Sequence, residues 1–350
     1  MPRHGVAGIA LAVLLVLTSC GGNGGGEAGA EAGGAYAQLS GELKGSGASF
    51  PDAYYQEVIG AFREVAPNVT VTYNATGSGT GKSEFGEGLT DFAGTDSLVD
   101  EDDGITEDFC YIPTVAAPIT VAYHLDGVDT LRLSPDTLAG IFQGDITAWN
   151  APAIAADNPG TQLPDTTITV VHRSDASGTT SNFTSYLDKA SEVWRLGSGD
   201  TVEWPAGSQG GAKNTGVAQI VKATPGAIGY VDLSDAKASG LSFAAIRNRD
   251  GNYVTPTLDG ATAALDGAEV ADDLSYDPLN AAGAKAYPIT APTYLLVRAR
   301  YADPEKAELV KAFVEFLLTD GQDLAPEVDF APLPDSLREA ALTQLDTIHG

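Results

Sequence analysis

The sequence predicts an α/β protein built from two domains. Segments with helical and with strand-like periodicity are mixed throughout its 350 residues, and no segment repeats. Apolar residues make up 43% of the chain, which is the share of an ordinary globular protein. About 310 residues follow the glycine-rich segment near the start, and a chain of that length usually exceeds a single hydrophobic core.

The first 20 residues contain a candidate export signal. A short basic start precedes an apolar run from about Val6 to Leu17, and Leu17-Thr18-Ser19-Cys20 resembles the lipobox of bacterial lipoproteins. We expect residues 1–19 to be removed as a signal peptide and Cys20 to carry fatty acyl groups such as palmitate. A transmembrane anchor is the alternative, although the run falls short of the roughly 20 residues that span a bilayer. The predicted location is extracytoplasmic, on the membrane.

Residues 20–40 are expected to form a flexible tether between the lipid and the folded body. This segment is rich in glycine, alanine and glutamate and has no apolar periodicity. The folded part is expected to begin near Leu39. Apart from Cys20 the chain has only Cys110, so no disulfide framework is expected, and Cys110 is predicted to be a small, partly buried apolar residue.

The predicted elements follow in chain order. A helical stripe with a proline suited to its first turn predicts a helix over 51–66, and alternation over 69–73 predicts a strand. The β-branched segment 167–173 reads as a strand and is followed by a helix over 181–190. The clearest amphipathic helix covers 304–318, whereas the Gly/Ala/Asp-rich stretch 258–286 is expected to be a loop or insertion.

The segment GSGTGKS, residues 77–83, resembles the phosphate loop of ATPases. The strict pattern needs a glycine five residues before the Gly81-Lys82 pair, and Thr76 stands there. No convincing strand ending in a magnesium-binding aspartate accompanies it, and ATP is scarce outside the cytoplasm. Lys82 is therefore expected on the solvated first turn of a helix that opens after Ser83.

Three Ser/Thr/Gly clusters stand where a strand or loop turns into a helix. They are GSGASFP at 45–51, GSGTGKS at 77–83 and RSDASGTT at 173–180. A helix N-terminus offers unpaired N–H groups and partial positive charge, and hydroxyls add donors. Each cluster alone also fits a helix N-cap or a turn. Together, with one arginine and two aspartates beside them, they predict a site for a tetrahedral oxyanion.

Longer stretches carry a family resemblance. Runs such as GDITAWN, DFAGTDS, WPAGSQGGAKNTGVAQIVKATPGAIGYV, AYPIT and FAPLPDSL, together with the cluster GSGASFP, resemble the phosphate-binding lipoproteins of bacterial high-affinity phosphate ABC transporters. The resemblance runs in order from about Gly45 to Ile348, although residues 258–286 align poorly. It implies a two-lobed periplasmic-binding-protein fold of type II, with the ligand in a cleft between α/β lobes joined by a two-crossover hinge. Lobe I would take 41–116 and 287–350, and lobe II 117–286.

The resemblance also implies a function. The chain would capture inorganic phosphate and deliver it to an ABC-type importer, and its partners would be two permease subunits driven by an ATPase that is a different chain. It would act as a monomer without catalysis, cofactor or metal. The net charge of −28, with only 19 basic residues, argues against nucleic acid or an anionic membrane surface as a partner.

The family's ligand contacts carry over onto nine residues of the three clusters and the DFAGTDS run. They are Ser49, Phe50, Ser78, Asp96, Arg173, Asp175, Ser177, Gly178 and Thr179. In that family the position of Ser49 is commonly threonine, and His172 stands where an arginine is frequent.

Each role has its own physical basis. Phe50, Gly178 and Thr179 would offer backbone N–H groups, and the serines and Thr179 would offer hydroxyls. Such local dipoles outweigh the repulsive global field, which is screened over roughly 8 Å. Arg173 supplies a positive charge on a planar guanidinium group, and Asp175 is expected to pair with it. The same pair also fits a purely structural salt bridge.

The presence of Asp96 predicts that the site selects phosphate over sulfate. A carboxylate beside an anion makes sense if the ligand carries a proton, because monohydrogen phosphate can donate to it whereas sulfate cannot. The alternative is that Asp96 caps a turn.

Other functions fit less well. A secreted phosphatase would need a nucleophile with a base or a metal cluster, yet the four histidines are scattered. A receptor for another oxyanion, such as sulfate or molybdate, conflicts with the presence of Asp96.

Overall fold

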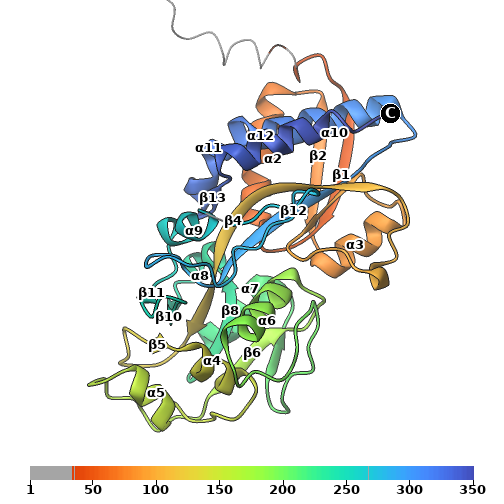
Figure 1. Ribbon diagram of the computed structural model, residues 1–350. Helices are drawn as coiled ribbons and strands as arrows, with labels where there is room; N and C mark the ends of the chain where they lie inside the picture. Colours follow the sequence, from red (N-terminus) through yellow and green to blue (C-terminus); the bar gives the residue numbers. More distant parts are fainter. Residues whose placement is uncertain (1–33, 35, 267) are drawn as a thin grey trace, which may run out of the picture.

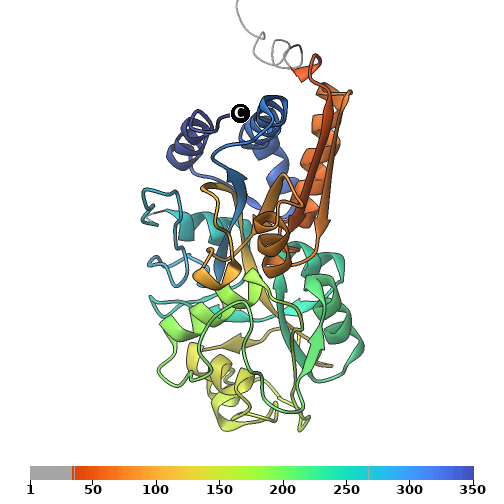
Figure 2. The same ribbon diagram turned by 90° about the vertical axis from the view of Figure 1, so that its right-hand side faces the viewer.

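The computed structural model describes residue 34, residues 36–266 and residues 268–350. It shows two α/β lobes stacked one above the other (Figures 1 and 2). The predicted signal peptide, Cys20 and most of the tether lie outside the described residues. Tyr36, which the sequence places in the tether, is buried against Phe62 and Phe316, so the folded body begins before Leu39. In the described part of the chain, no helix is long and apolar enough to cross a membrane.

The first lobe, at the top of Figure 1, is built on a sheet with the strand order β2-β1-β3-β12-β4. β1, β2 and β3 are parallel, and β12 is antiparallel to β3 and β4. The short β13 also pairs with β4. The bounds are β1 (Gly41–Gly47), β2 (Val69–Ala75), β3 (Phe92–Thr95), β4 (Phe109–Tyr123), β12 (Thr290–Arg298) and β13 (Ala331–Pro332).

The second lobe continues the same sheet in the order β4-β8-β6-β7, and β9 also pairs with β4. β6 is parallel to β7 and β8. A separate sheet has the order β11-β10-β5. The bounds are β5 (Arg132–Leu133), β6 (Thr169–Arg173), β7 (Gln209–Gly211), β8 (Ala227–Asp232), β9 (Ser242–Phe243), β10 (Ala245–Arg247) and β11 (Tyr253–Val254).

Helices cover both lobes. In the first lobe they are α2 (Asp52–Val65), α3 (Ser78–Gly86), α10 (Pro304–Leu318), α11 (Asp320–Leu324) and α12 (Asp335–Leu345), with the 3₁₀ turns η1 (Glu101–Asp103) and η2 (Ala325–Val328). The remaining helices are α4 (Pro135–Phe142), α5 (Pro152–Asp157), α6 (Gly178–Ala190), α7 (Lys213–Ala223), α8 (Leu233–Ala238) and α9 (Leu258–Leu265).

β4 joins the lobes. Its residues from Phe109 to Pro118 pair with β12, and those from Ile119 to Tyr123 pair with β8. All but its first residue are buried. Figure 1 shows the strand as a long curved ribbon that passes β12 and bends down into the second lobe. Because β4 and β12 both lie at the junction, two strands carry the connection between the lobes.

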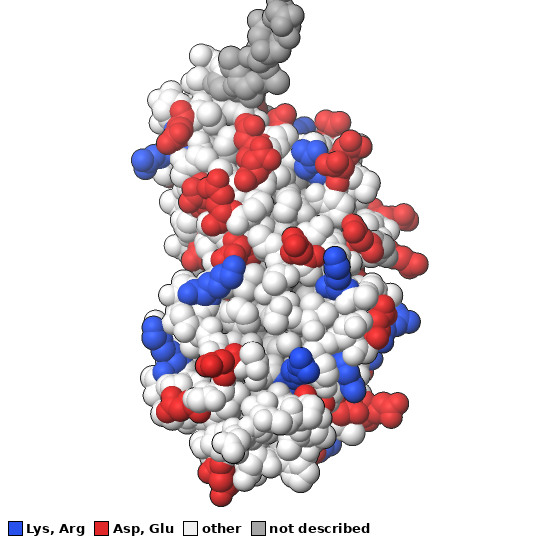
Figure 3. Space-filling model, turned by 90° about the vertical axis from the view of Figure 1, so that its left-hand side faces the viewer, with Lys and Arg blue, Asp and Glu red and all other residues white. Residues whose placement is uncertain are grey.

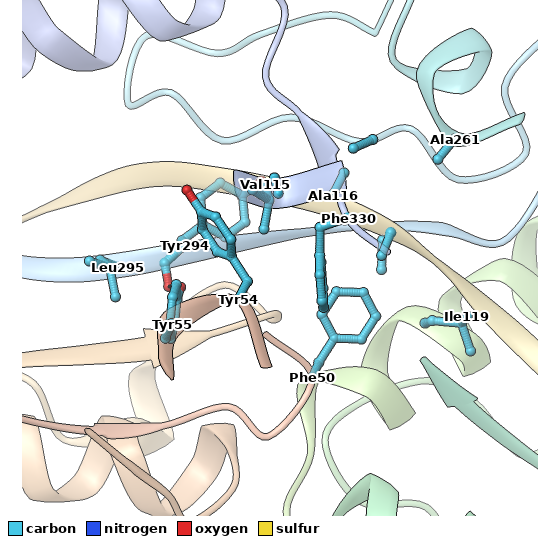
Figure 4. Close-up of a cluster of buried hydrophobic side chains, with 14 of the residues drawn as sticks. Phe50, Tyr54, Tyr55, Val115, Ala116, Ile119, Ala261, Tyr294, Leu295 and Phe330 are labelled. Carbon is cyan, nitrogen blue, oxygen red and sulfur yellow. Dashed lines mark hydrogen bonds between the residues drawn. The ribbon is translucent and has the colours of Figure 1, made fainter. Parts of the chain in front are cut away.

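A core cluster lies at this junction. The ring of Phe50, after β1, meets the ring of Phe330, before β13, edge to face with centroids 5.7 Å apart. Ile119 of β4 and Ala261 of α9 lie around them (Figure 4). Buried aromatic rings are rigid and large, so this cluster fixes the turn after β1.

Most predicted elements form within a residue or two of their expected bounds. The helix over 304–318 is confirmed at both ends, and the helix over 51–66 is present as α2. The prediction that 258–286 is a loop is wrong at its start, where α9 forms. Thr257 caps this helix by accepting from the N–H of Gly260, and Ala261, Ala264 and Leu265 are buried.

Candidate functional site

The turns that carry the three clusters meet between the lobes. In the first lobe, the parallel strands β1 and β2 lead into α2 and α3, and in the second lobe β6 leads into α6. The carboxyl ends of parallel strands lie at one edge of a sheet, which is where α/β proteins place their ligands. The geometry thus brings two helix starts of one lobe opposite a helix start of the other.

The two turns of the first lobe are joined to each other. The N–H of Gly77 donates to the carbonyl of Gly47 at 2.8 Å. Gly77 precedes α3 with a φ of 102°, a conformation that favours glycine. Ser78 is buried as the first residue of α3. Ser49 is also buried, whereas the ring of Phe50 turns into the core, so Phe50 can present only its backbone to a ligand.

The turn of the second lobe fits closely against the first lobe. Ser177 caps α6 by accepting from the N–H of Thr180 at 3.2 Å, and its own proton stays available to donate. A Cβ added to Gly178 would lie 2.7 Å from the Oγ of Ser78 and 2.7 Å from the Cβ of Asp96. Only glycine allows this approach, so Gly178, Ser78 and Asp96 meet across the two lobes.

Arg173 is buried at the end of β6 and is held from several sides. Its Nε donates to Asp175 at 2.9 Å, and its Nη1 donates to Thr179 at 3.3 Å and to Asn214 at 3.2 Å. Burial raises the pKa of Asp175, but hydrogen bonds and charge from Arg173 outweigh this effect and leave that pKa lowered. The predicted pair of Arg173 and Asp175 therefore forms, and it fixes the guanidinium plane.

Asp96 follows β3 and is 3% exposed. Burial raises the pKa of its carboxyl group to about 7, although a hydrogen bond from Thr293 and the charge of Arg173 oppose the shift. The Oγ of Thr293 donates to Oδ1 of Asp96 at 2.8 Å. The turn itself is closed by Thr95, whose hydroxyl accepts from the N–H of Ser97 at 3.2 Å. The alternative that Asp96 caps the turn thus loses its support.

The expectation for Lys82 is wrong. The helix begins at Ser78 instead of after Ser83, which turns Lys82 inward, and only 1% of the residue is exposed. Its Nζ lies 2.8 Å from Asp103 and 3.0 Å from Asp200. Burial lowers the pKa of Lys82, but the two carboxylates more than offset it and raise the pKa overall. These carboxylates hold the ammonium, so GSGTGKS lacks the free lysine of a nucleotide loop.

Sequence reasoning missed three residues of the site. Asn214, in the first turn of α7, is fully buried, contacts Arg173 and Thr179, and donates its N–H to Ser49 at 3.3 Å. Asn182, one turn into α6, donates to the carbonyl of Asp96 at 2.5 Å. Thr293 lies in β12. Asn214 follows a Ser/Gly segment before a helix and could have been found, whereas Thr293 has no local signal.

The arrangement combines neutral donors with two charged groups. Helix starts leave backbone N–H groups without intrahelical acceptors, and the buried hydroxyls of Ser49, Ser78 and Thr179 lie beside them. Arg173 adds one positive charge, and Asp96 can hold or accept a proton near neutral pH. All nine predicted residues lie on strand ends, on turns or in the first turns of helices at this junction. Such a set of groups suits a partly protonated tetrahedral oxyanion.

Comparison with known proteins identifies the family. A model described as the PBP superfamily domain matches residues 31–321. The phosphate-binding protein PstS of Methanocaldococcus jannaschii is 37% identical, covering 87% of this chain and 86% of the relative. The chain belongs to the PstS family. The phosphate-binding protein PstS 3 of Mycobacterium tuberculosis is 35% identical over 99% of both chains.

Solved structures agree with the PstS assignment at the level of fold. A high-affinity periplasmic phosphate-binding protein called PfluDING, bound with phosphate, superposes with a TM-score of 0.71 at 23% identity, covering 87% of this chain and 93% of that one. A phosphate-binding protein from Stenotrophomonas maltophilia gives a TM-score of 0.68 at 22% identity, covering 87% and 94%. The predicted two-lobed fold is confirmed.

Proposed function

We propose that this chain is an extracytoplasmic receptor that captures inorganic phosphate and delivers it to an ABC-type importer. The observation that carries the proposal is the buried carboxyl group of Asp96. Asp96 lies beside Ser78 and Gly178, the first residues of α3 and α6, and close enough to Arg173 for that charge to lower its pKa. A carboxyl group in such a place fits an anion that brings its own proton. The relatives named as phosphate-binding proteins support the same ligand.

The nine residues would divide the work of binding. Backbone N–H groups of Phe50, Gly178 and Thr179 and the hydroxyls of Ser49, Ser78, Ser177 and Thr179 would donate to phosphate oxygens. Arg173 would donate from its planar fork, oriented by Asp175. The ionised form of Asp96, which predominates above its pKa of about 7, would accept the ligand's proton and so disfavour sulfate, which has none to give.

The remaining expectations belong to the same proposal. Cys20 would carry the lipid that anchors the chain outside the cytoplasmic membrane, and the chain would act as a monomer on permease subunits. Lobe I would take 41–116 and 287–350, and lobe II 117–286, which the change of partner along β4 between Pro118 and Ile119 supports. The proposed role is binding and delivery without chemistry on the ligand.

Calorimetric titration tests this function directly. The full-length chain, held in detergent at about pH 8 so that Asp96 is mostly ionised, is titrated with phosphate, sulfate and ATP. The titrations are repeated on Asp96→Asn and on Asp126→Asn. Asp126 is the matched control because its side chain is 95% exposed, it is not one of the nine residues, and its replacement also exchanges a carboxyl group for an amide. We expect tight phosphate binding by the parent and the control, with no response to sulfate or ATP.

The variant Asp96→Asn should bind sulfate and phosphate with similar affinities, because an amide can donate to a fully ionised oxyanion. Sulfate binding by the parent protein would contradict the selectivity argument. ATP binding would reopen the nucleotide-loop interpretation of GSGTGKS.

A further inference from the structure

The ion pair of Lys82 with Asp200 crosses from lobe to lobe beside the proposed phosphate site. Lys82 lies on α3, which packs on β1 and β3 of the first lobe. Asp200 lies in the connection between α6 and β7 of the second lobe. The Nζ of Lys82 is 3.0 Å from Oδ2 of Asp200, and the Lys82 side chain is 2% exposed. Neither residue belongs to the nine that are proposed to contact phosphate.

The other partners of the Lys82 ammonium all belong to the first lobe. Asp103 of η1 lies 2.8 Å away, and Lys82 donates to the hydroxyl of Ser97 at 3.3 Å and to the carbonyl of Leu98 at 3.4 Å. If the lobes part, Lys82 keeps these partners and loses Asp200 alone. The contact with Asp200 is thus a property of the closed arrangement.

Asp200 is also attached to the ligand turn of its own lobe. Its backbone carbonyl accepts from the N–H of Ser177 at 2.9 Å, and Ser177 is the N-cap of α6. The neighbouring Gly199 donates its N–H to Thr184, two turns into the same helix. A force on the side chain of Asp200 therefore acts on the start of α6, next to Gly178.

We infer that Lys82 and Asp200 form a latch that holds the closed lobes together over the ligand. Both are positioning residues, since they act on the site through α3 and the start of α6. The inference rests on the proposed function, because it assigns the pair to the retention of phosphate. A side chain that the nucleotide-loop interpretation would aim at a phosphate here fastens one lobe to the other.

The latch acts after the ligand has entered, so its loss should appear in the dissociation rate. Removal of Asp200 leaves Lys82 paired with Asp103, and no buried charge loses its last partner. We expect Asp200→Ala to raise the dissociation rate of phosphate about tenfold and to leave the association rate within about twofold, which corresponds to about 1.4 kcal/mol. Stopped-flow fluorescence of the full-length chain measures the association rate on mixing with phosphate and the dissociation rate on displacement of bound phosphate.

Electrostatic repulsion alone would predict that Asp200→Ala slows the release of phosphate. Asp200 lies close enough to Asp96 to raise the pKa of that carboxyl group, so it also repels a bound anion. If repulsion were the whole effect of Asp200, its removal would tighten phosphate binding. Faster release from Asp200→Ala therefore isolates the mechanical contribution of the ion pair.

Asp103→Ala is the matched control. It removes the other carboxylate from the same ammonium and leaves the pair across the lobes intact, so the dissociation rate should not rise. A double-mutant cycle with Lys82→Met supplies the coupling between Lys82 and Asp200, which should account for most of the loss in Asp200→Ala. Equal losses in Asp103→Ala and Asp200→Ala would overturn the latch, because both would then act through the packing of Lys82.

The distance between the lobes gives a readout that does not depend on phosphate. Spin labels at the exposed positions Leu89 and Val193 would report it by pulsed electron resonance. Asp200→Ala should broaden this distance distribution toward longer values in the ligand-free chain, and Asp103→Ala should not. If the parent chain fails to bind phosphate but Asp200→Ala still loosens the lobes, the latch stands and the proposed ligand is wrong. An unchanged distribution together with an unchanged release rate would refute the latch.

Discussion

Asp96 has an ionised form that the closed protein stabilises poorly. Its carboxyl group has little water around it, and Thr293 supplies one hydrogen bond in place of a full hydration shell. Arg173 lowers the free energy of the ionised form, yet burial outweighs it and the pKa stands near 7. The residue proposed to sense the ligand's proton is therefore poised at neutral pH before any ligand arrives.

This pKa has a consequence for stability. Below about pH 4 both folded and unfolded states hold the proton, and between about pH 4 and about pH 7 only the folded state holds it, so stability falls as the pH rises through this window. Asparagine does not ionise, so the stability of Asp96→Asn does not fall for this reason. The free energy of unfolding of Asp96→Asn minus that of the parent should therefore increase by about 2 to 3 kcal/mol between about pH 5 and about pH 8.

Urea unfolding of the ligand-free parent and of Asp96→Asn at the two pH values checks this. Other groups titrate alike in both proteins and cancel in the difference. A gap that stays constant with pH would mean that Asp96 is already ionised at the lower pH.

Arg173 is the second residue whose chemistry can be tested alone. Lysine keeps the charge but cannot hold Asp175, Thr179 and Asn214 from one planar group. We expect Arg173→Lys to weaken phosphate binding by about 100-fold, or about 3 kcal/mol. Arg195→Lys is the control, since Arg195 is also paired with an aspartate but is 55% exposed. Calorimetry measures the phosphate affinity of both variants. Equal affinities would show that Arg173 does not contact phosphate.

The start of α6 is the element on which closure of the lobes depends. A methyl group on Gly178 would collide with Ser78 and Asp96 of the opposite lobe. Gly178→Ala should therefore weaken phosphate binding by tenfold or more, about 1.4 kcal/mol or above. The free energy of unfolding should hardly change, because parting of the lobes relieves the clash and alanine favours a helix.

Gly60→Ala, on α2, provides the comparison for this variant, because its new methyl group would meet no atom within 4 Å. Calorimetry and thermal unfolding of both variants separate binding from folding. Unchanged affinity in Gly178→Ala would show that the lobes bind phosphate without reaching the contact seen here.

The predictability of each element follows from where its information lies. The helix over 304–318 has its cap, its proline and its apolar stripe within its own sequence, so both ends were predicted. Six of the nine residues of α3 are glycine, serine or threonine, which are poor helix formers, and its start is set by packing. A Cβ on its Gly81 would lie 2.3 Å from the Cα of Gly47 in β1, a closeness that no local pattern reveals.

The residues of the site also divide into those with a local sequence signal and those that only the fold brings together. Residues on helix starts after strands were predicted, because the hydroxyls, glycines and strand pattern are adjacent in sequence. Thr293 lies 197 residues from Asp96 and Asp200 lies far from Lys82 along the chain, so only the folded chain brings them together. The burial of Lys82 was missed for the same reason, since its two carboxylates come from different lobes.

The whole molecule presents an unfavourable field to an anion. The formal net charge is −28. Asp and Glu side chains are spread over the face shown in Figure 3, with Lys and Arg interspersed mainly on its lower part. An approaching phosphate ion therefore meets long-range repulsion, and the attractive donors act only at short range.

Salt should therefore speed binding. Raising the ionic strength from about 10 mM to about 150 mM shortens the Debye length from about 30 Å to about 8 Å and screens the repulsion. We expect the association rate of phosphate to rise severalfold, whereas the dissociation rate stays nearly constant. Stopped-flow measurements in sodium chloride test this. A falling association rate would point to a local positive potential that dominates the approach.

β4 has a further consequence for how the chain folds. Its 15 residues are one apolar strand, and each half completes the sheet of a different lobe. A fragment that ends within it would expose an unpaired hydrophobic edge, which is a template for aggregation. The two lobes are thus two halves of one cooperative unit, and neither could be inherited, exchanged or produced as an independent module without its share of this strand.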